Sequence, residues 1–392
     1  MDHALFTRLS QFSMLLQEGL FPRLEPETGP VTGKMELFVA CCAMIPFERL
    51  LPSGCWNGRP SKDRVAIARA FLAKSVFGFA HTRQLLDVLK RDQTLRPLCG
   101  WRHAGQMPHE STFSRAFAEF AQTGLAQAAH EAVIAGTQQQ RLIGHICRDS
   151  TAIEARERYP EPVNKKAAPK GKAAPKENNG KARRGRKGKQ QRQTQAQREA
   201  SGTRIQKQAR MDDVKAMLAD IPVKCDLGAK RGTGGGTYYW RGYKLHLDVA
   251  DGQIPITAVL TAASVHDSQV AIPMIHMTTK KVTYLYDLAD SAYDAKAIRE
   301  VSARLGHKPI IDIHTRAKPK TQLPSRVKPQ PELSPAEERR YKERTLVERV
   351  FGRLKDEFGA EFVRVRGAAK VMTHLMFGVL ALTIDQTLRL HK

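Results

Sequence analysis

The sequence predicts an α/β protein in which a mixed-sheet domain follows an α-helical N-terminal domain. Apolar residues recur at helical spacing within the first 140 residues, and from Leu142 onward strand-like runs alternate with helical ones. A Lys-, Ala- and Gly-rich insertion at about residues 160–210 interrupts the second pattern. At 392 residues the chain suits about two domains and an insertion, so we place the domains at 1–140 and 141–392.

Helices are expected throughout the first domain. Apolar periodicity marks the segments Arg64 to Phe77, Arg83 to Leu89 and Ser111 to Phe120. The sequence Gly58-Arg59-Pro60-Ser61 suits the start of a helix near Lys62. Arg and Lys on the exposed faces of short helices are typical of a helix-turn-helix that binds DNA, but an ordinary helical bundle has the same pattern. We expect DNA binding by this domain, with the plain bundle as the alternative.

The second domain is expected to contain a sheet. Leu142 to Ser150 has the pattern of a buried strand, and the runs Tyr238 to Val249 and Ile254 to Leu260 flank Asp251-Gly252, a strong β-hairpin signal. The other expected elements are a strand at Val282 to Asp287, a helix at Tyr293 to Leu305, a short strand at Ile310 to Ile313, a helix containing Tyr341 and a buried C-terminal helix at Val371 to Ile384.

The charge balance predicts a polyanionic partner. The chain has 64 Lys and Arg against 39 Asp and Glu, so nucleic acid is the first candidate and an anionic membrane surface the second. Between Glu161 and Arg210 there are 16 Lys and Arg against 3 Asp and Glu, with almost no large apolar residue. We expect this insertion to be disordered, either making loose phosphate contacts or serving as a solvated spacer.

Location and redox state follow from three patterns. There is no secretion leader, and the apolar stretch Val371 to Ile384 is too short to span a bilayer. We therefore expect a cytoplasmic protein without membrane contact. The six cysteines form no Cys-x-x-Cys pair, so reduced thiols and no structural zinc are expected.

Four polar residues near the C-terminus follow the spacing Tyr-x2-Arg-x3-Glu-x6-Lys: Tyr341, Arg344, Glu348 and Lys355. At about 100° per residue these steps keep the four side chains within roughly an 80° arc, so they are expected on one helix face. A carboxylate among Arg, Lys and Tyr suits a metal ion beside a phosphate. The plain alternative is an i,i+4 ion pair between Glu348 and Arg344.

Two further carboxylates stand where strand patterns end: Asp149, and Asp290 in Asp290-Ser291-Ala292-Tyr293. With Glu348 they form an acidic trio. Carboxylate oxygens are the ligands that Mg²⁺ prefers, and two such ions can hold the attacking and leaving oxygens of a phosphodiester in line. We expect the trio to bind two Mg²⁺ ions, which Mn²⁺ can replace, while nearby Arg and Lys grip the nucleic acid.

Each of these carboxylates has a competing interpretation. Asp149 can be an ordinary turn residue, and Asp287 competes with Asp290 because it lies at the same strand edge. Asp267 and Asp226 are expected in turn or capping roles, and His246 as a packed histidine.

The order Asp149, Asp290, Glu348, together with the Asp290-Ser291-Ala292-Tyr293 motif and the Tyr341/Arg344/Glu348/Lys355 spacing, resembles the DDE transposases of bacterial insertion sequences. The resemblance covers about Arg141 to Lys392 and, more weakly, Gly58 to Arg115. It implies an RNase H-like core with Asp149 on the first strand, Asp290 just after a later strand and Glu348 on the following helix.

The resemblance also implies a function. Such a protein is a Mg²⁺-dependent transposase that cuts at the ends of its element with water and joins the freed 3′ hydroxyl to target DNA. Asp149, Asp290 and Glu348 would be the catalytic metal ligands, and Tyr341, Arg344 and Lys355 would hold DNA. The implied partners are double-stranded DNA, as terminal inverted repeats and as target, and a second copy in a homodimer at the bacterial nucleoid. A catalytically silent DNA-binding relative and an RNase H-like nuclease without strand transfer are the alternatives.

Overall fold

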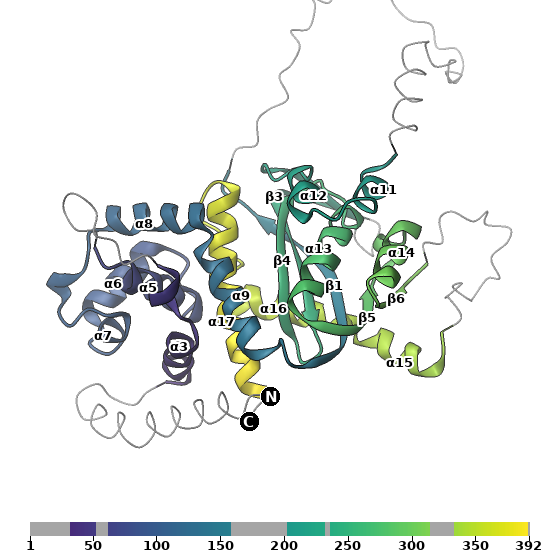
Figure 1. Ribbon diagram of the computed structural model, residues 1–392. Helices are drawn as coiled ribbons and strands as arrows, with labels where there is room; N and C mark the ends of the chain where they lie inside the picture. Colours follow the sequence, from purple (N-terminus) through teal and green to yellow (C-terminus); the bar gives the residue numbers. More distant parts are fainter. Residues whose placement is uncertain (1–31, 52–61, 158–201, 232–235, 314–332, 391–392) are drawn as a thin grey trace, which may run out of the picture.

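The computed structural model describes residues 32–51, 62–157, 202–231, 236–313 and 333–390. A group of helices lies on one side of the molecule, and a six-stranded sheet with its own helices lies on the other (Figure 1). The C-terminal helix α17 (Ala368–Leu390) stands between these two parts and contacts both. The predicted α/β class is confirmed, with a helical N-terminal region and a mixed open sheet consistent with an RNase H-like fold.

The N-terminal helices occur where apolar periodicity predicts them, because α5, α6 and α8 cover the three periodic segments. Helix α5 begins at Arg64 because the Asp63 carboxylate accepts hydrogen bonds from Val65 N at 2.9 Å and Ala66 N at 3.2 Å. The predicted capping sequence at 58–61 lies outside the described residues. The helices are α3 (Gly33–Met44), α4 (Phe47–Leu50), α5 (Arg64–Val76), α6 (Thr82–Arg91), α7 (Leu95–Cys99), η2 (Ala104–Gln106), α8 (Glu110–Thr123) and α9 (Leu125–Thr137).

The sheet is centred on two long strands that pair with each other, β1 (Leu142–Glu154) and β3 (Thr237–Ala250). The parallel strands β5 (Thr283–Ala289) and β6 (Lys308–Ile311) extend it beyond β1. On the other side, β3 pairs antiparallel with β2 (Asp226–Arg231) and β4 (Ile254–Ala262). The hairpin predicted around Asp251-Gly252 is confirmed, whereas β2 was not predicted.

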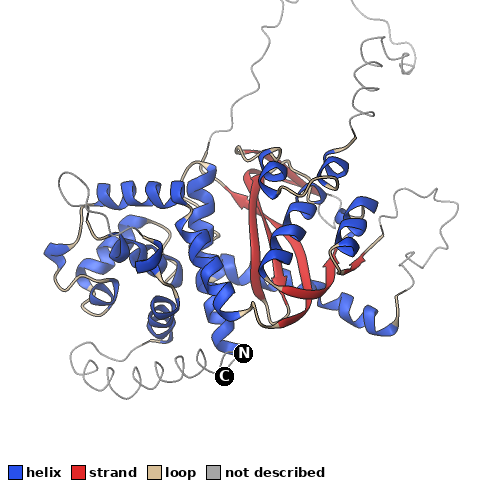
Figure 2. Ribbon diagram, in the orientation of Figure 1, coloured by secondary structure: helices blue, strands red, loops and turns tan. Residues whose placement is uncertain are grey.

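Helices cover both faces of this sheet (Figure 2). Side chains alternate between faces along a strand, so Arg148 and Asp248 point to one face and Cys147 to the other. Helix α13 (Ser268–Lys281) packs on the first face, where Thr278 Oγ1 donates to Asp248 Oδ2 at 2.6 Å. On the second face Cys147 Sγ donates to Glu343 O at 3.4 Å, next to α16 (Leu346–Asp356). The remaining helices of this domain are α11 (Arg204–Gln208), α12 (Val214–Ala219) and α14 (Lys296–Arg304).

Three predictions about elements need correction or limitation. Of the insertion predicted to be disordered, 158–201 lie outside the described residues, but α11 forms within the predicted range with Thr203 and Gln206 as its capping box. The helix expected from Tyr293 begins at Lys296, after the short helix η3 (Ser291–Tyr293). The helix expected through Tyr341 is broken into α15 (Pro335–Lys342), the 3₁₀ turn η6 (Glu343–Thr345) and α16.

Helix α17 explains why the two halves form one body. Among the described residues it is the one helix long and apolar enough to cross a membrane, yet 72% of its apolar window is buried inside the protein. It packs against α3, α5, α8 and α9 on one side and against β4 and α16 on the other. The prediction of a buried C-terminal helix is therefore confirmed.

Candidate active site

The structure places Asp149 and Asp290 beside each other on two neighbouring parallel strands: Asp149 lies within β1, and Asp290 directly follows β5. In the β1–β5 pairing Arg148 lies opposite Ala289. Asp149 follows the first of these residues and Asp290 follows the second, so the two acids are neighbours across the strands. Asp149 accepts a hydrogen bond from Ser150 N at 2.7 Å, and Asp290 accepts one from Ala292 N at 2.9 Å. The sequence predicted both acids at strand ends, which is confirmed for Asp290 and wrong for Asp149, because β1 continues to Glu154 through its pairing with β3.

Both carboxyl groups are held in an environment that disfavours their charge. The pKa of Asp149 is raised to about 6, chiefly by burial and also by the neighbouring Asp290 and Asp267, against the lowering effects of the Ser150 N hydrogen bond and of Lys230. Burial likewise raises the pKa of Asp290. No Lys or Arg in the described ranges forms an ion pair with either acid. A cation bound between them would therefore relieve an existing electrostatic cost.

A third carboxylate, Asp267, belongs to this centre and was not predicted there. It stands at the start of α13 but makes no capping hydrogen bond, contrary to the capping role expected from the sequence. Instead Lys244 Nζ donates to Asp267 Oδ1 at 3.0 Å, and Ser150 also hydrogen-bonds this carboxylate. Burial alone would raise the pKa of Asp267, but His246, Lys244 and these hydrogen bonds lower it below its usual value. The sequence signal was weak, because His266-Asp267-Ser268 has the composition of an ordinary turn.

The residues of the C-terminal motif are divided between two helices and the turn that joins them. Tyr341 lies in the last turn of α15, while Glu348 lies on α16 after the 3₁₀ turn. Arg344, in that turn, lies over the Tyr341 ring at 5.8 Å, and its charge lowers the pKa of Asp290. The single helix predicted through these residues is interrupted by η6, whose 3₁₀ spacing is tighter than that of an α-helix. The shared face of the four side chains stays a prediction.

Glu348 is the member of the predicted trio that stays apart in this structure. Its side chain is 60% exposed and lies 3.9 Å from Arg344, the ion pair named as the plain alternative. Lys355 follows two turns later, partly exposed. Within the described residues, no three His, Cys, Asp or Glu side chains are grouped closely enough to hold one metal ion. The carboxylate oxygens of Asp149 and Asp290 are therefore the ones available to a metal ion, and Arg344 lies between these acids and Glu348.

A buried ion network fixes the strand beneath these acids. Arg148, only 2% exposed, forms ion pairs with Asp248 at 2.7 Å and Asp287 at 3.3 Å. Asp287 also accepts hydrogen bonds from Ser302 Oγ at 2.5 Å and from Tyr284 OH at 3.2 Å, so its carboxylate is fully engaged within the core. Such a network orders its surroundings, because an unpaired charge at this depth would be very costly. Asp290, rather than Asp287, is the acid left open at this strand end.

The fold and the site together define a class of protein. A mixed RNase H-like sheet with two half-buried carboxylates on neighbouring parallel strands, in a chain of net charge +25, is typical of enzymes that process nucleic acids.

Comparison with known families gives the narrower identity. Residues 200–384 match the transposase DDE domain, and residues 36–119 match a transposase domain, DUF772. Both matches are to transposase domains, in agreement with the resemblance to DDE transposases that the motifs indicated. Asp290 and Glu348 lie within the first match, and Asp149 lies outside both. No curated protein and no solved structure matched the chain.

Proposed function

We propose that this chain is a Mg²⁺-dependent DNA transposase that cuts at the ends of its own element and joins the 3′ hydroxyl to target DNA. The observation that carries the proposal is the neighbouring pair of half-buried carboxylates, Asp149 and Asp290, whose pKa values are raised chiefly by burial. The DDE transposases typically use a divalent metal ion. Two neighbouring carboxylates fit Mg²⁺ or Mn²⁺, since both prefer oxygen ligands.

In this proposal Asp149 and Asp290 are the primary metal ligands and Glu348 completes a two-ion site when DNA is bound. Bound Mg²⁺ would activate water for cutting and the 3′ hydroxyl for joining, and would stabilise the leaving oxygen. Arg344 pairs with Glu348 at 3.9 Å, so a phosphate that attracts Arg344 would free Glu348 to turn toward the other acids. Tyr341, Arg344 and Lys355 would hold the DNA strand.

The domain division and the partners are part of the same proposal. We assign residues 1–140 to an N-terminal DNA-binding domain and 141–392 to the catalytic domain, interrupted at about 160–210 by the basic insertion. The DNA partners would be terminal inverted repeats and a target site. Pairing two element ends would require two copies of the chain on the DNA, and the protein would act in the bacterial cytoplasm at the nucleoid.

The test uses a supercoiled plasmid carrying the DNA that flanks the gene on both sides, incubated with the full-length protein and Mg²⁺. Wild type should cut at the element ends and yield joined products. Asp149→Ala and Asp290→Ala should each lower cutting by at least about a thousandfold while still binding the ends. Asp356→Asn, an exposed acid on α16, is the matched control and should cut normally.

Three outcomes would contradict the proposal. Cutting by Asp149→Ala at the wild-type rate would remove the acidic pair from catalysis. Nicked DNA without joined product would support a nuclease, and specific binding without cutting by wild type would support a silent relative.

A further inference from the structure

A cleft of about 830 Å³ lies away from the acidic pair, where the N-terminal helices meet the catalytic domain. Three parts of the chain line it: the region from α5 to α6, the residues just after β1, and the segment between α16 and α17. Its cationic lining residues are Lys74, Arg83, Arg91, Arg156 and Arg364. We call this site the junction cleft.

Most of these cations have no acidic partner. Arg83 lies 3.5 Å from Glu110, but in the described part of the chain Lys74, Arg91, Arg156 and Arg364 form no ion pair. Asp87 is the one other acid lining the cleft. The cleft therefore carries an excess of uncompensated positive charge, unlike the many paired cations elsewhere on the surface.

Lys74 is the most informative of these residues. It is 7% exposed and makes no hydrogen bond within the described residues, and burial lowers its pKa to about 8. Its neighbour His374 is buried and donates a hydrogen bond from Nε2 to Gly359 O at 3.0 Å; it cannot balance the charge of Lys74, because burial and Lys74 lower the pKa of His374 to about 3. The Lys74 stem is buried while its ammonium reaches the cleft without an acceptor among the described residues, so an anion entering the cleft would gain a partner that is already partly desolvated.

The catalytic-domain wall is held in place by Glu157. Its Oε1 accepts hydrogen bonds from Tyr243 OH at 2.9 Å and from Gly367 N at 2.6 Å, which joins the end of β1 to the segment before α17. Arg156 and Arg364 are thereby fixed on the same side of the cleft. Phe362, 52% exposed, lies beneath the Arg364 guanidinium at 5.8 Å and orients it.

The spacing from the acidic pair fits a DNA strand. Arg156 follows Asp149 by seven residues along and just beyond β1, which at about 3.3 Å per residue is roughly 20 Å. A DNA strand covers that distance in about six or seven nucleotides. The separation of the acidic pair from Arg156 is thus within the length of a short duplex whose reacting phosphate lies at Asp149 and Asp290.

We propose that the junction cleft binds the sugar-phosphate backbone of double-stranded DNA, about six or seven base pairs from the phosphate at the acidic pair. The inference rests on the proposed transposase function and adds to it a second, sequence-independent grip on the same duplex. Contacts from both the N-terminal helices and the catalytic domain would fix the duplex direction relative to the acids.

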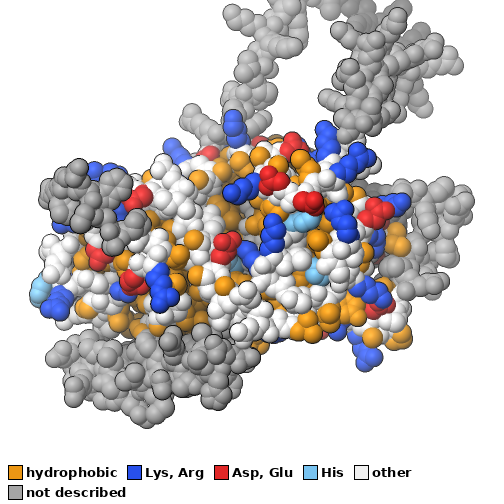
Figure 3. Space-filling view, in the orientation of Figure 1, with side chains coloured by type: hydrophobic (Ala, Val, Ile, Leu, Met, Phe, Trp, Pro, Cys, Tyr) orange, Lys and Arg blue, Asp and Glu red, His pale blue; other side chains and the backbone are white. Residues whose placement is uncertain are grey.

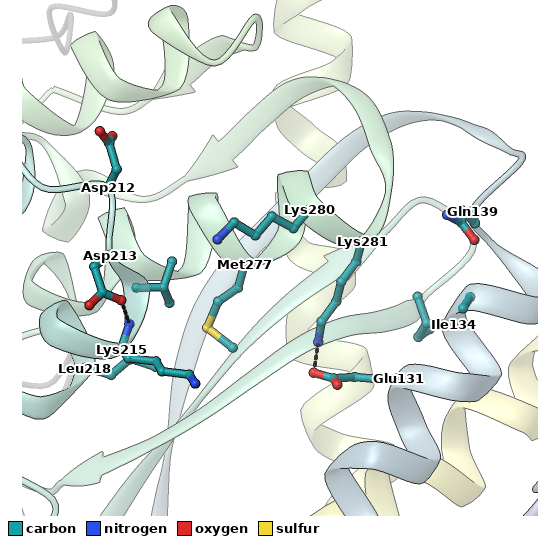
Figure 4. Close-up of a pocket in the computed structure, with 12 residues that line it drawn as sticks. Glu131, Ile134, Gln139, Asp212, Asp213, Lys215, Leu218, Met277, Lys280 and Lys281 are labelled. Carbon is teal, nitrogen blue, oxygen red and sulfur yellow. Dashed lines mark hydrogen bonds and ion pairs between the residues drawn. The ribbon is translucent and has the colours of Figure 1, made fainter.

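The test measures binding of the full-length protein to a fluorescein-labelled random-sequence duplex of about 30 base pairs, in EDTA, between about 50 and 200 mM salt. The cleft variant is Arg156→Gln/Arg364→Gln, both exposed residues. The matched control is Lys215→Gln/Lys280→Gln, exposed residues of a different pocket of about 760 Å³ between α9, α12 and α13. Figure 4 shows that pocket, where the neighbouring Lys281 is already paired with Glu131 at 3.3 Å.

The cleft variant should make the slope of log affinity against log salt shallower by about 2, since each lost phosphate contact changes it by roughly 0.9. The control should keep the wild-type slope, and the basic insertion is identical in all variants. Lys74→Met should shift the slope by about 1 in the same direction, with melting curves to verify folding. A wild-type slope in the cleft variant, or an equal loss in the control, would overturn the inference.

Two further measurements separate this inference from its alternatives. If the cleft variant loses binding to polyglutamate but keeps its DNA slope, the site takes an acidic protein segment and the DNA assignment is wrong. Asp149→Ala should bind the duplex with the wild-type slope. Cutting by Asp149→Ala at the wild-type rate would contradict the transposase proposal. A wild-type salt slope in the cleft variant would contradict only the cleft inference.

Discussion

Asp267 is placed to position the acidic pair rather than to bind DNA. Lys244 neutralises it at 3.0 Å, and Ser150, the residue next to Asp149, hydrogen-bonds it. Such outer groups typically change metal affinity or activity by ten- to a hundredfold. We predict that Asp267→Asn lowers DNA cutting by about that factor and raises the Mg²⁺ concentration needed for half-maximal cutting.

The control for this prediction is Asp226→Asn, because Asp226 makes a comparable hydrogen bond, from Ser264 N at 2.9 Å, and is not coupled to either acid. Both variants should keep their melting temperature within a few degrees. Equal cutting by Asp267→Asn and wild type at limiting Mg²⁺ would show that Asp267 is a structural residue only.

Lys74 gives a prediction about pH. Its pKa is lowered from 10.5 to about 8 in the folded protein, so below pH 8 the charged side chain costs stability, and this cost disappears as the pH rises toward 10.5. Lys74→Met should therefore be more stable than wild type at pH 7, by up to about 3 kcal/mol. The difference should shrink between pH 8 and pH 10.5 in urea titrations. A constant difference across that range would mean that Lys74 is not desolvated.

Some side-chain roles could be predicted from the sequence and others could not. Asp149 and Asp290 were predicted because an acid at the end of an apolar run is a local pattern. Arg148 pairs with Asp248 and Asp287, which lie 100 and 139 residues away, so nothing local identifies that network. The exposed position of Glu348 beside Arg344 was one of two interpretations of the i,i+4 spacing, and the local pattern could not choose between it and a role in metal binding.

At the scale of elements, strong periodicity was predictive and tertiary pairing was not. The hairpin of β3 and β4 and helices α5, α6 and α8 follow from local patterns. Strand β2, with the sequence Asp-Leu-Gly-Ala-Lys-Arg, has little intrinsic strand preference and exists because it pairs with β3. Helix α13 was missed because it is buried on several sides and contains Pro273, so it lacks a clear polar face.

The point where three strands meet depends on one glycine. Gly242 pairs with Glu154 of β1 and with Asp226 of β2, and its φ is +154°. A Cβ there would lie 2.0 Å from Ile153 O, which is backbone and cannot move away without breaking the β1–β3 pairing. We predict that Gly242→Ala destabilises the protein by about 3 kcal/mol or more, measured by urea unfolding.

The matched control for that substitution is Gly236→Ala, just before β3, where a Cβ would meet nothing within 4 Å. It should change stability by less than about 1 kcal/mol. Similar losses in both variants would indicate a general intolerance of this region instead of a clash at the strand junction.

At the scale of the whole molecule, the positive surface charge could be predicted from the sequence, whereas the core shared by the two halves could not. Figure 3 shows Lys and Arg side chains spread over the half of this face that carries α11 to α14. That surface charge is readable from composition alone. The core is not, because α17 joins residues of the N-terminal helices and of the sheet into one hydrophobic cluster that includes Phe71, Leu245 and Phe377.

This shared core predicts that the N-terminal helices and the sheet unfold together. Phe377 on α17 is 1% exposed and packs against Phe71 of α5 with ring centroids 6.2 Å apart. Phe377→Ala should cost about 3–5 kcal/mol, the usual range for a buried Phe. Hydrogen exchange should then speed up by the same factor in α8 and in β4, since both elements contact α17. Phe362→Ala, with its ring 52% exposed, should leave exchange in both elements unchanged. Faster exchange in α8 alone would mean that the helices form an independent folding unit, and α17 would then be part of that unit rather than the link between the halves.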